Sequence, residues 1–203
     1  NVTILGNYIG LGSNGTTNLG NTFGGVNSGG PGTIVGGTAT GSRNVISGNG
    51  GNGVSVYGAT GSGTVQGNYI GYTANGLAAI ANGDATTSSV SLQNNVQFGG
   101  TTTAARNYLT SGGLSNGIGI FGGTPFGGSS TGGNVVQGNC IGTNINCVVQ
   151  AGFETRAGVI LAFDTFNNVI GGTDIGSGNV IAGNYEGVIS LSISGAGFYP
   201  LNN

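Results

Sequence analysis

The sequence GNYIG occupies residues 6–10 and again residues 67–71, and the closely similar GNCIG occupies residues 138–142. One short motif therefore occurs three times, at starting positions Gly6, Gly67 and Gly138. A motif that recurs at a nearly fixed interval is typical of an array of stacked structural units. The question is what these units are and what the array does.

Two further landmarks follow each motif in the same order. The first is TIVGGT at 33–38, VQFGGT at 96–101 and NVIGGT at 168–173. The second is GSRNVISGN at 41–49, AARNYLTSG at 104–112 and GSGNVIAGN at 176–184. Because the landmarks keep their order, we expect a single domain over residues 1–203, built from three modules at roughly 1–63, 64–134 and 135–203.

The composition restricts the fold class. The 203 residues include 48 glycines and only 4% charged residues, but Gly does not fall at every third position and Pro totals 3, which excludes collagen. Disorder is typical of chains with high net charge and few β-branched residues, and this chain has the opposite composition. Short Val/Ile pairs between Gly and Asn, without a helical apolar stripe, predict an all-β fold of many short strands.

The spacing of these strands predicts a parallel β-solenoid. VISGN ends at Asn49 and TVQGN ends at Asn68. This interval predicts about nine to ten coils of roughly 20 residues each, with three coils in each module. Val, Ile and Leu would face inward, and recurring Asn side chains would stack at the corners as an amide ladder. Gly beside each Asn would supply a positive φ. The expected corner residues are Asn7, Asn49, Asn68, Asn139 and Asn184.

The stretches RNVISGNGGNGVSV and VQGNYIG resemble the parallel β-helix repeats of large extracellular surface proteins of bacteria and archaea. The resemblance covers nearly the whole chain and implies a right-handed parallel β-helix. Families that share this fold include pectin-degrading enzymes, phage tailspikes, adhesins and fibrous surface proteins. The fold therefore does not choose among these functions.

Charge and cysteine content narrow the partners and the compartment. Three arginines without any lysine provide no basic surface for nucleic acid, and no apolar run approaches the roughly 18 residues of a membrane span. Cys140 replaces the motif tyrosine found at Tyr8 and Tyr69, and we expect it to form a disulfide with Cys147 that closes a loop outside the core. Two free thiols are the alternative. A disulfide favours an extracellular or cell-surface location.

Catalysis on this scaffold would need paired carboxylates, or Ca²⁺-binding acids with a basic residue. The interval from Glu154 to Asp174 and the interval from Asp164 to Glu186 are each close to the expected length of a coil, and Arg156 lies nearby in the sequence. The chain has no Lys or His to act as a base, so we expect no enzymatic activity, no cofactor and no metal. A polysaccharide hydrolase or lyase, and a weak Ca²⁺ site, are the alternatives.

Two other patterns carry expectations. Arg43 and Arg106 stand at equivalent positions in the second landmark, and we expect both to bind backbone carbonyl groups. Asn14 in NGT and Asn1 in NVT fit the acceptor pattern for N-glycosylation.

The two ends of the solenoid suggest its function. The sequence starts within a module and ends in GAGFYPLNN, and neither end has a polar cap that would block pairing of an open strand edge. Either the chain is a piece of a longer solenoid, or its open edges join subunits head to tail into a filament.

We therefore expect a structural extracellular protein, a subunit of a fibre, sheath or stalk whose partner is a further copy of itself. The expected interface residues are Val2, Ile4, Leu5, Val188, Ile189, Leu191 and Ile193. The alternative is a carbohydrate-active enzyme, or a glycan-binding tailspike or adhesin module, that uses the C-terminal acids and has surface glycans as partners.

Overall fold

The computed structural model describes residues 1–57, 63–113, 115–122 and 131–191. Within these ranges the chain forms short strands and one 3-10 helix, η1 (Thr103–Ala105). The predicted all-β class is confirmed.

The strands form three parallel sheets of six strands each. The first sheet contains β1 (Thr3–Ile4), β4 (Thr33–Gly36), β7 (Gly63–Gln66), β10 (Val96–Gly99), β14 (Val135–Gln137) and β18 (Val169–Ile170). The second contains β2 (Tyr8–Ile9), β5 (Val45–Ile46), β8 (Tyr69–Ile70), β11 (Tyr108–Leu109), β15 (Cys140–Ile141) and β19 (Val180–Ile181). The third contains β3 (Val26–Ser28), β6 (Val54–Val56), β9 (Ser88–Leu92), β12 (Asn116–Phe121), β16 (Ala157–Ala162) and β20 (Glu186–Leu191). A small fourth sheet pairs β13 (Thr131–Gly132) with β17 (Thr165–Phe166).

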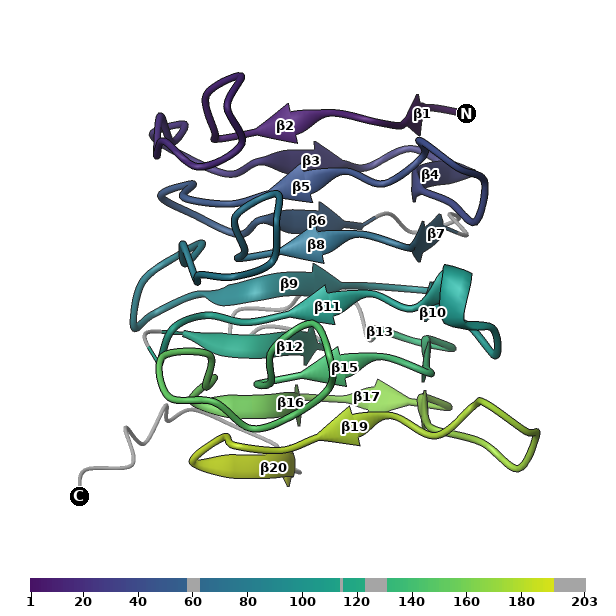
Figure 1. Cartoon of the computed structure of the whole chain (residues 1–203). Helices are drawn as coiled ribbons and strands as arrows, with labels where there is room; N and C mark the ends of the chain where they lie inside the picture. The colour runs from purple at the N-terminus through teal and green to yellow at the C-terminus, as the bar shows by residue number, and fades with distance from the viewer. Residues whose placement is uncertain (58–62, 114, 123–130, 192–203) are drawn as a thin grey trace.

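The chain visits the three sheets in turn, so each set of three strands is one coil of a right-handed parallel β-solenoid (Figure 1). Coil 1 is β1–β2–β3, coil 2 is β4–β5–β6, coil 3 is β7–β8–β9, coil 4 is β10–β11–β12, coil 5 is β14–β15–β16 and coil 6 is β18–β19–β20. The coils stack in chain order, so the first and last coils form the two ends of the described solenoid.

The predicted number of coils is wrong. The described residues form six coils rather than nine or ten, and each module holds two coils rather than three. Val35 pairs with Val65, and Phe98 pairs with Val136, so a coil is much longer than the sequence predicted. The interval between Asn49 and Asn68 misled the prediction because these residues occupy different corners. Asn49 precedes β6 of the third sheet, whereas Asn68 precedes β8 of the second.

The core consists of apolar columns that run along the solenoid. In the second sheet Ile46, Ile70, Leu109 and Ile141 are directly paired from coil to coil and fully buried. The columns end in the partly buried Ile9 and Ile181 of coils 1 and 6. Burial of such side chains is the main favourable term in folding, so the inner coils are stabilised more than the end coils.

Glycines at the ends of strands make the close stacking of coils feasible. Gly71 follows β8 with φ +85°, and a Cβ built on it would collide with the carbonyl oxygen of Thr110 in coil 4. Gly41 also has a positive φ, +84°, but a Cβ there would meet no atom within 4 Å. A side chain at Gly41 would therefore strain only the backbone, whereas a side chain at Gly71 would strain the backbone and also collide with the next coil.

We predict that Gly41→Ala lowers the free energy of unfolding by about 1 kcal/mol, because only the left-handed backbone conformation opposes it. Gly71→Ala should cost about 3 kcal/mol or more, because its methyl group would also push coils 3 and 4 apart. Denaturant unfolding of both variants measures the difference. Equal losses would show that coil packing tolerates a side chain at Gly71.

Candidate assembly interface

One buried corner of the solenoid is a ladder of asparagines between the first and second sheets. Each asparagine donates its main-chain N–H and its Nδ2–H to Oδ1 of the asparagine in the following coil, with N···O distances of 3.0–3.2 Å. From coil 1 to coil 6 its members are Asn7, Asn44, Asn68, Asn107, Asn139 and Asn179. All links point in the same direction, so the ladder has a donor end and an acceptor end.

The ladder contains Asn7, Asn68 and Asn139, which the motif predicted for a shared corner. The interleaved asparagines of coils 2, 4 and 6 were missed, although each precedes a strand of the second sheet just as the motif asparagine does. Asn49 and Asn184 lie at a different corner, before the third sheet. There Asn49 links Asn21 to Asn82, and Asn184 accepts from the N–H and hydroxyl of Thr155.

The corner at the ladder alternates between two lengths. In coils 1, 3 and 5 the asparagine follows the last inward residue of the first sheet by three positions, as Val65 and Asn68 show. In coils 2, 4 and 6 it follows by nine positions, as Phe98 and Asn107 show. Each module is therefore one short-corner coil followed by one long-corner coil.

The long-corner coil binds the next short-corner coil through a repeated set of contacts. Between coils 2 and 3 the N–H of Gly37 donates to Gln66 O (2.8 Å), and Arg43 Nε donates to Gly67 O (3.0 Å). Between coils 4 and 5 Gly100 donates to Gln137 O (2.9 Å), and Arg106 Nε donates to Gly138 O (2.8 Å). Both arginines thus bind backbone carbonyls, as the sequence predicted.

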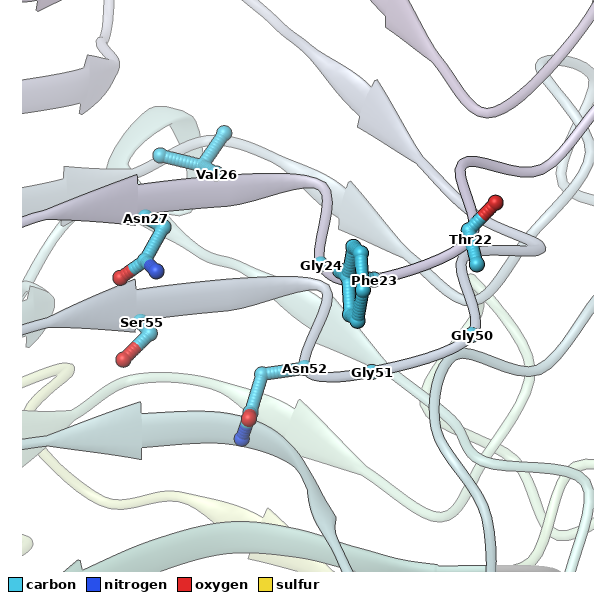
Figure 2. Close-up of a pocket in the computed structure, with 9 residues that line it drawn as sticks. All are labelled: Thr22, Phe23, Gly24, Val26, Asn27, Gly50, Gly51, Asn52 and Ser55. Atoms are coloured by element: carbon cyan, nitrogen blue, oxygen red, sulfur yellow. The ribbon is translucent and has the colours of Figure 1, made fainter.

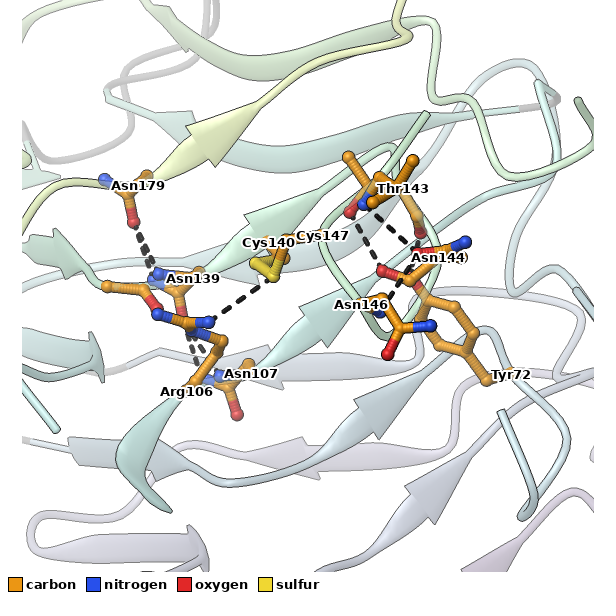
Figure 3. The surroundings of a disulfide bond; sticks show 12 residues. Tyr72, Arg106, Asn107, Asn139, Cys140, Thr143, Asn144, Asn146, Cys147 and Asn179 are labelled. Atoms are coloured by element: carbon orange, nitrogen blue, oxygen red, sulfur yellow. Dashed lines mark hydrogen bonds between the residues drawn. A yellow bond between two sulfur atoms is a disulfide. The ribbon is translucent and has the colours of Figure 1, made fainter. Parts of the chain in front are cut away.

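The arginines also cover an outward-facing side chain of the following coil. The Arg43 guanidinium lies 4.1 Å from the centre of the Tyr69 ring, a cation–π contact. Tyr69 lies in the same column of the second sheet as Cys140. There Arg106 Nη1 contacts Cys147 Sγ at 3.4 Å (Figure 3).

The predicted disulfide is present and lies outside the apolar columns. Cys140 of β15 and Cys147 are bonded, with their Cα atoms 5.4 Å apart. The bond closes residues 140–147 into a loop, and Ile145 of that loop packs against a second apolar cluster that contains Tyr69, Tyr72 and Phe153. Burial raises the pKa of Tyr72, so its hydroxyl stays protonated and donates to Thr143 O of that loop (Figure 3).

At the end formed by coil 6, the groups that bind a following coil have no partner among the described residues. Val169 and Gly171 direct their N–H groups back to coil 5, and so do Val180 and Ala182. Because N–H groups alternate in direction along a strand, those of Ile170 and Ile181 face the open end.

At coil 6 the last groups of the ladder and of the long corner are also hydrogen-bond donors. Neither the Asn179 N–H nor the Gly172 N–H has an acceptor within the described chain. Position 178 carries Gly where coils 2 and 4 have Arg43 and Arg106.

At the end formed by coil 1, acceptor groups of the ladder and of β2 receive no hydrogen bond from the described residues. Oδ1 of Asn7 accepts no hydrogen bond from the described residues. Asn7 and Ile9 accept hydrogen bonds from Val45 and Ser47 of coil 2 with their C=O groups. Because carbonyl groups alternate in direction along a strand, the C=O of Tyr8 faces the open end. The first charged residue of the chain is Arg43, so coil 1 has no charged side chain.

The predicted interface residues lie on these two end coils. Val2, Leu5, Val188 and Leu191 are exposed, and Ile4 and Ile189 are partly buried. Ile193 lies outside the described residues. As far as the described residues go, the two ends therefore combine strand edges without a neighbouring strand, ladder groups without a partner and the ends of the apolar columns.

The structure separates both predicted carboxylate pairs, although the Glu186 N–H donates to Arg156 O (3.1 Å) and so places these two candidate residues side by side. Glu154 lies before β16, where its carboxylate accepts from the Gly152 N–H, whereas Asp174 lies in the long corner of coil 6. Asp164 follows β16 and Glu186 begins β20, so these two lie at opposite ends of the third sheet. Arg156 directs its main-chain N–H to Ser115 O, and no ion pair joins it to these acids in the described ranges. The two carboxylate intervals do not span one coil, because a coil is longer than the sequence predicted.

Other expected features are placed as follows. Asn14 is exposed in a turn where its Oδ1 accepts from the N–H groups of Thr16 and Thr17, and Asn1 is exposed beside β1. Over the part of the chain that is described, no three His, Cys, Asp or Glu side chains gather as a metal site. None of the described residues belongs to a helix long and apolar enough to cross a bilayer.

We predict that Asn68→Ala lowers the free energy of unfolding by about 3 kcal/mol, because it leaves buried donors of Asn44 without an acceptor. Asn7→Ala should cost about 1 kcal/mol, because no group of the described chain donates to its Oδ1. Denaturant unfolding measures both. If the two variants lose equal stability, the ladder does not contribute through its links between coils.

Comparisons of the sequence with protein-family models and with curated proteins, and of the structure with solved structures, found no match. The fold assignment therefore rests on the pairing of the strands.

Proposed function

We propose that this chain is a structural subunit of an extracellular fibre, sheath or stalk in which copies stack end to end as one solenoid. The observation that carries the proposal is the match between the open ends and the joints inside the chain. Coil 6 has the long corner of coils 2 and 4, and coil 1 has the short corner of coils 3 and 5. Stacking coil 1 of a second copy on coil 6 therefore continues the alternation.

The donors at the coil 6 end would have acceptors at the coil 1 end of the next copy. The Asn179 donors would meet Oδ1 of Asn7 in the next copy, as Asn44 meets Asn68 between coils 2 and 3. Gly172 N–H would meet Leu5 O, as Gly37 meets Gln66. Ile181 would continue its column onto Ile9. Pairing backbone groups and burying apolar side chains at one joint favours stacking over exposure to water.

The terminal strands have few of the features by which proteins usually protect open edges. Charged side chains, prolines and bulges serve this purpose. The edge strands β1–β3 and β18–β20 contain no proline and one charged residue, Glu186. The Cys140–Cys147 bond supports an extracellular location, because disulfides persist in oxidising compartments.

We predict that Thr3→Pro prevents stacking without unfolding the solenoid. Thr3 is exposed, and since Ile34 N–H donates to Val2 O, the alternation directs the Thr3 N–H away from coil 2. Proline at position 3 therefore removes an N–H donor from the contact between copies and none from the pairing of coils 1 and 2. Thr3→Val is the matched control, because it keeps the N–H.

Negative-stain microscopy and sedimentation of concentrated protein measure the result. We expect filaments from the wild type and Thr3→Val and single particles from Thr3→Pro, with equal midpoints of chemical unfolding measured under dilute, non-assembling conditions. Filaments from Thr3→Pro, or a wild type that stays monomeric at high concentration, would contradict the proposal.

We predict that Gly178→Arg strengthens stacking. The new guanidinium would reach Gly6 O and the Tyr8 ring of the next copy, as Arg43 reaches Gly67 O and Tyr69. A Cβ at Gly178 meets no atom within 4 Å, so the fold accommodates the substitution. A contact worth about 1 kcal/mol lowers the concentration needed for assembly about fivefold.

Gly178→Ala is the control for the loss of glycine alone and should leave that concentration unchanged. Light scattering against protein concentration measures all three proteins. If Gly178→Arg assembles no more readily than Gly178→Ala, coil 6 does not meet coil 1 in the proposed register.

A further inference from the structure

A hollow of about 280 Å³ opens on the outer face of the third sheet, between coils 1 and 2 (Figure 2). Its volume is near the lower end of the range for small-molecule sites, roughly 300–1,000 Å³. Figure 2 shows Phe23 and Asn52 on the loops that lead into β3 and β6, and Asn27 and Ser55 on the strands themselves.

An exposed aromatic ring forms one wall of the hollow. Phe23 is 84% exposed, and the loop of coil 2 beneath it contains Gly50 and Gly51. A Cβ on Gly50 would collide with Thr22 O, and one on Gly51 would lie 3.3 Å from the Phe23 backbone. The two glycines allow the two loops to stack closely. They also place no side chain in the hollow beside the Phe23 ring.

Neutral polar groups with unused hydrogen-bonding capacity form the other wall. Asn27 and Ser55 are directly paired on β3 and β6, and within the described chain neither side chain makes a hydrogen bond. Nδ2 of Asn52 donates to Ser88 O (2.7 Å), which fixes the amide and leaves its Oδ1 without a donor among the described residues. No lining residue is charged.

We propose that this hollow is a binding subsite for an uncharged carbohydrate. A pyranose ring has an apolar C–H face that packs on an aromatic ring, and its hydroxyl groups both donate and accept hydrogen bonds. Phe23 would contact the C–H face, and Asn27, Asn52 and Ser55 would bind hydroxyls. The absence of charge in the lining disfavours anionic sugars, whose carboxylate or sulfate groups would lose hydration without a counter-charge.

The other end of the same sheet provides a matched control. Tyr185 precedes Val188 by three positions, as Phe23 precedes Val26, and Tyr185 is 80% exposed. The outward column that holds Asn27 and Ser55 in coils 1 and 2 holds Ile160 and Ile189 in coils 5 and 6. Tyr185 is therefore an exposed ring without the neighbouring amides. This inference does not rest on the proposed stacking, and the test uses dilute, unassembled protein, in which Tyr185 of one copy cannot lie against Phe23 of another.

Affinity electrophoresis of the full chain tests the proposal in native gels that contain a neutral glucan, mannan or galactan, or the anionic polysaccharide alginate. We expect at least one neutral polysaccharide to retard the wild type and Tyr185→Ala, and alginate to retard neither. Phe23→Ala should weaken retardation about tenfold, the loss expected for one aromatic contact with its burial. Asn27→Ala should weaken it as well.

Three results would overturn the inference: no retardation by any of the three neutral polysaccharides, retardation by alginate alone, or equal retardation of Phe23→Ala and the wild type. A loss in Tyr185→Ala as large as in Phe23→Ala would also overturn it, because binding would then follow exposed rings in general. Far-ultraviolet circular dichroism of each variant verifies that the coils remain folded.

Discussion

The asparagine at each second-sheet corner, buried in coils 2 to 5, ties one coil to the next and sets the register of the solenoid. Its Oδ1 accepts two hydrogen bonds from the preceding coil in the inner part of the ladder, and its own donors serve the following coil and a backbone carbonyl. A buried amide with unmet capacity is costly, so a slipped register would lose several of these bonds at once. A slip of one residue would also turn the inward side chains of the apolar columns toward water.

The ladder also explains why loops vary while the coils do not. Any insertion that leaves the asparagine and the paired strands in place lies outside the stack. The long corners and the loop that the Cys140–Cys147 bond closes are such insertions. The alternation of long and short corners gives the chain a two-coil repeat with a direction, and this direction makes the two ends complementary rather than alike. A head-to-tail contact of that kind extends without limit, which suits the proposed fibre.

The sequence predicted the fold class because Gly-Asn corners and β-branched pairs are local signals. It did not predict the number of coils, because Asn49 and Asn68 look alike in sequence while they serve different corners. The disulfide was predicted from the substitution of Tyr by Cys140 at a repeated position. The predicted carboxylate pairs were wrong for the same reason, because they assumed a coil of roughly 20 residues. The Phe23 hollow was missed because it forms only where the loops of coils 1 and 2 stack, and these loops share no sequence motif. The sequence therefore does not show that the Phe23 ring is exposed or that the Asn27 side chain beside it lacks a hydrogen-bond partner among the described residues.

The central claim is that copies of this chain continue one another's coils. X-ray fibre diffraction from aligned, concentrated protein tests it most directly. Six coils at the inter-strand spacing of about 4.8 Å predict a meridional reflection at that spacing and a subunit repeat of roughly 29 Å along the same axis. A repeat unrelated to six coils, or diffraction from isolated particles without a common axis, would contradict the account.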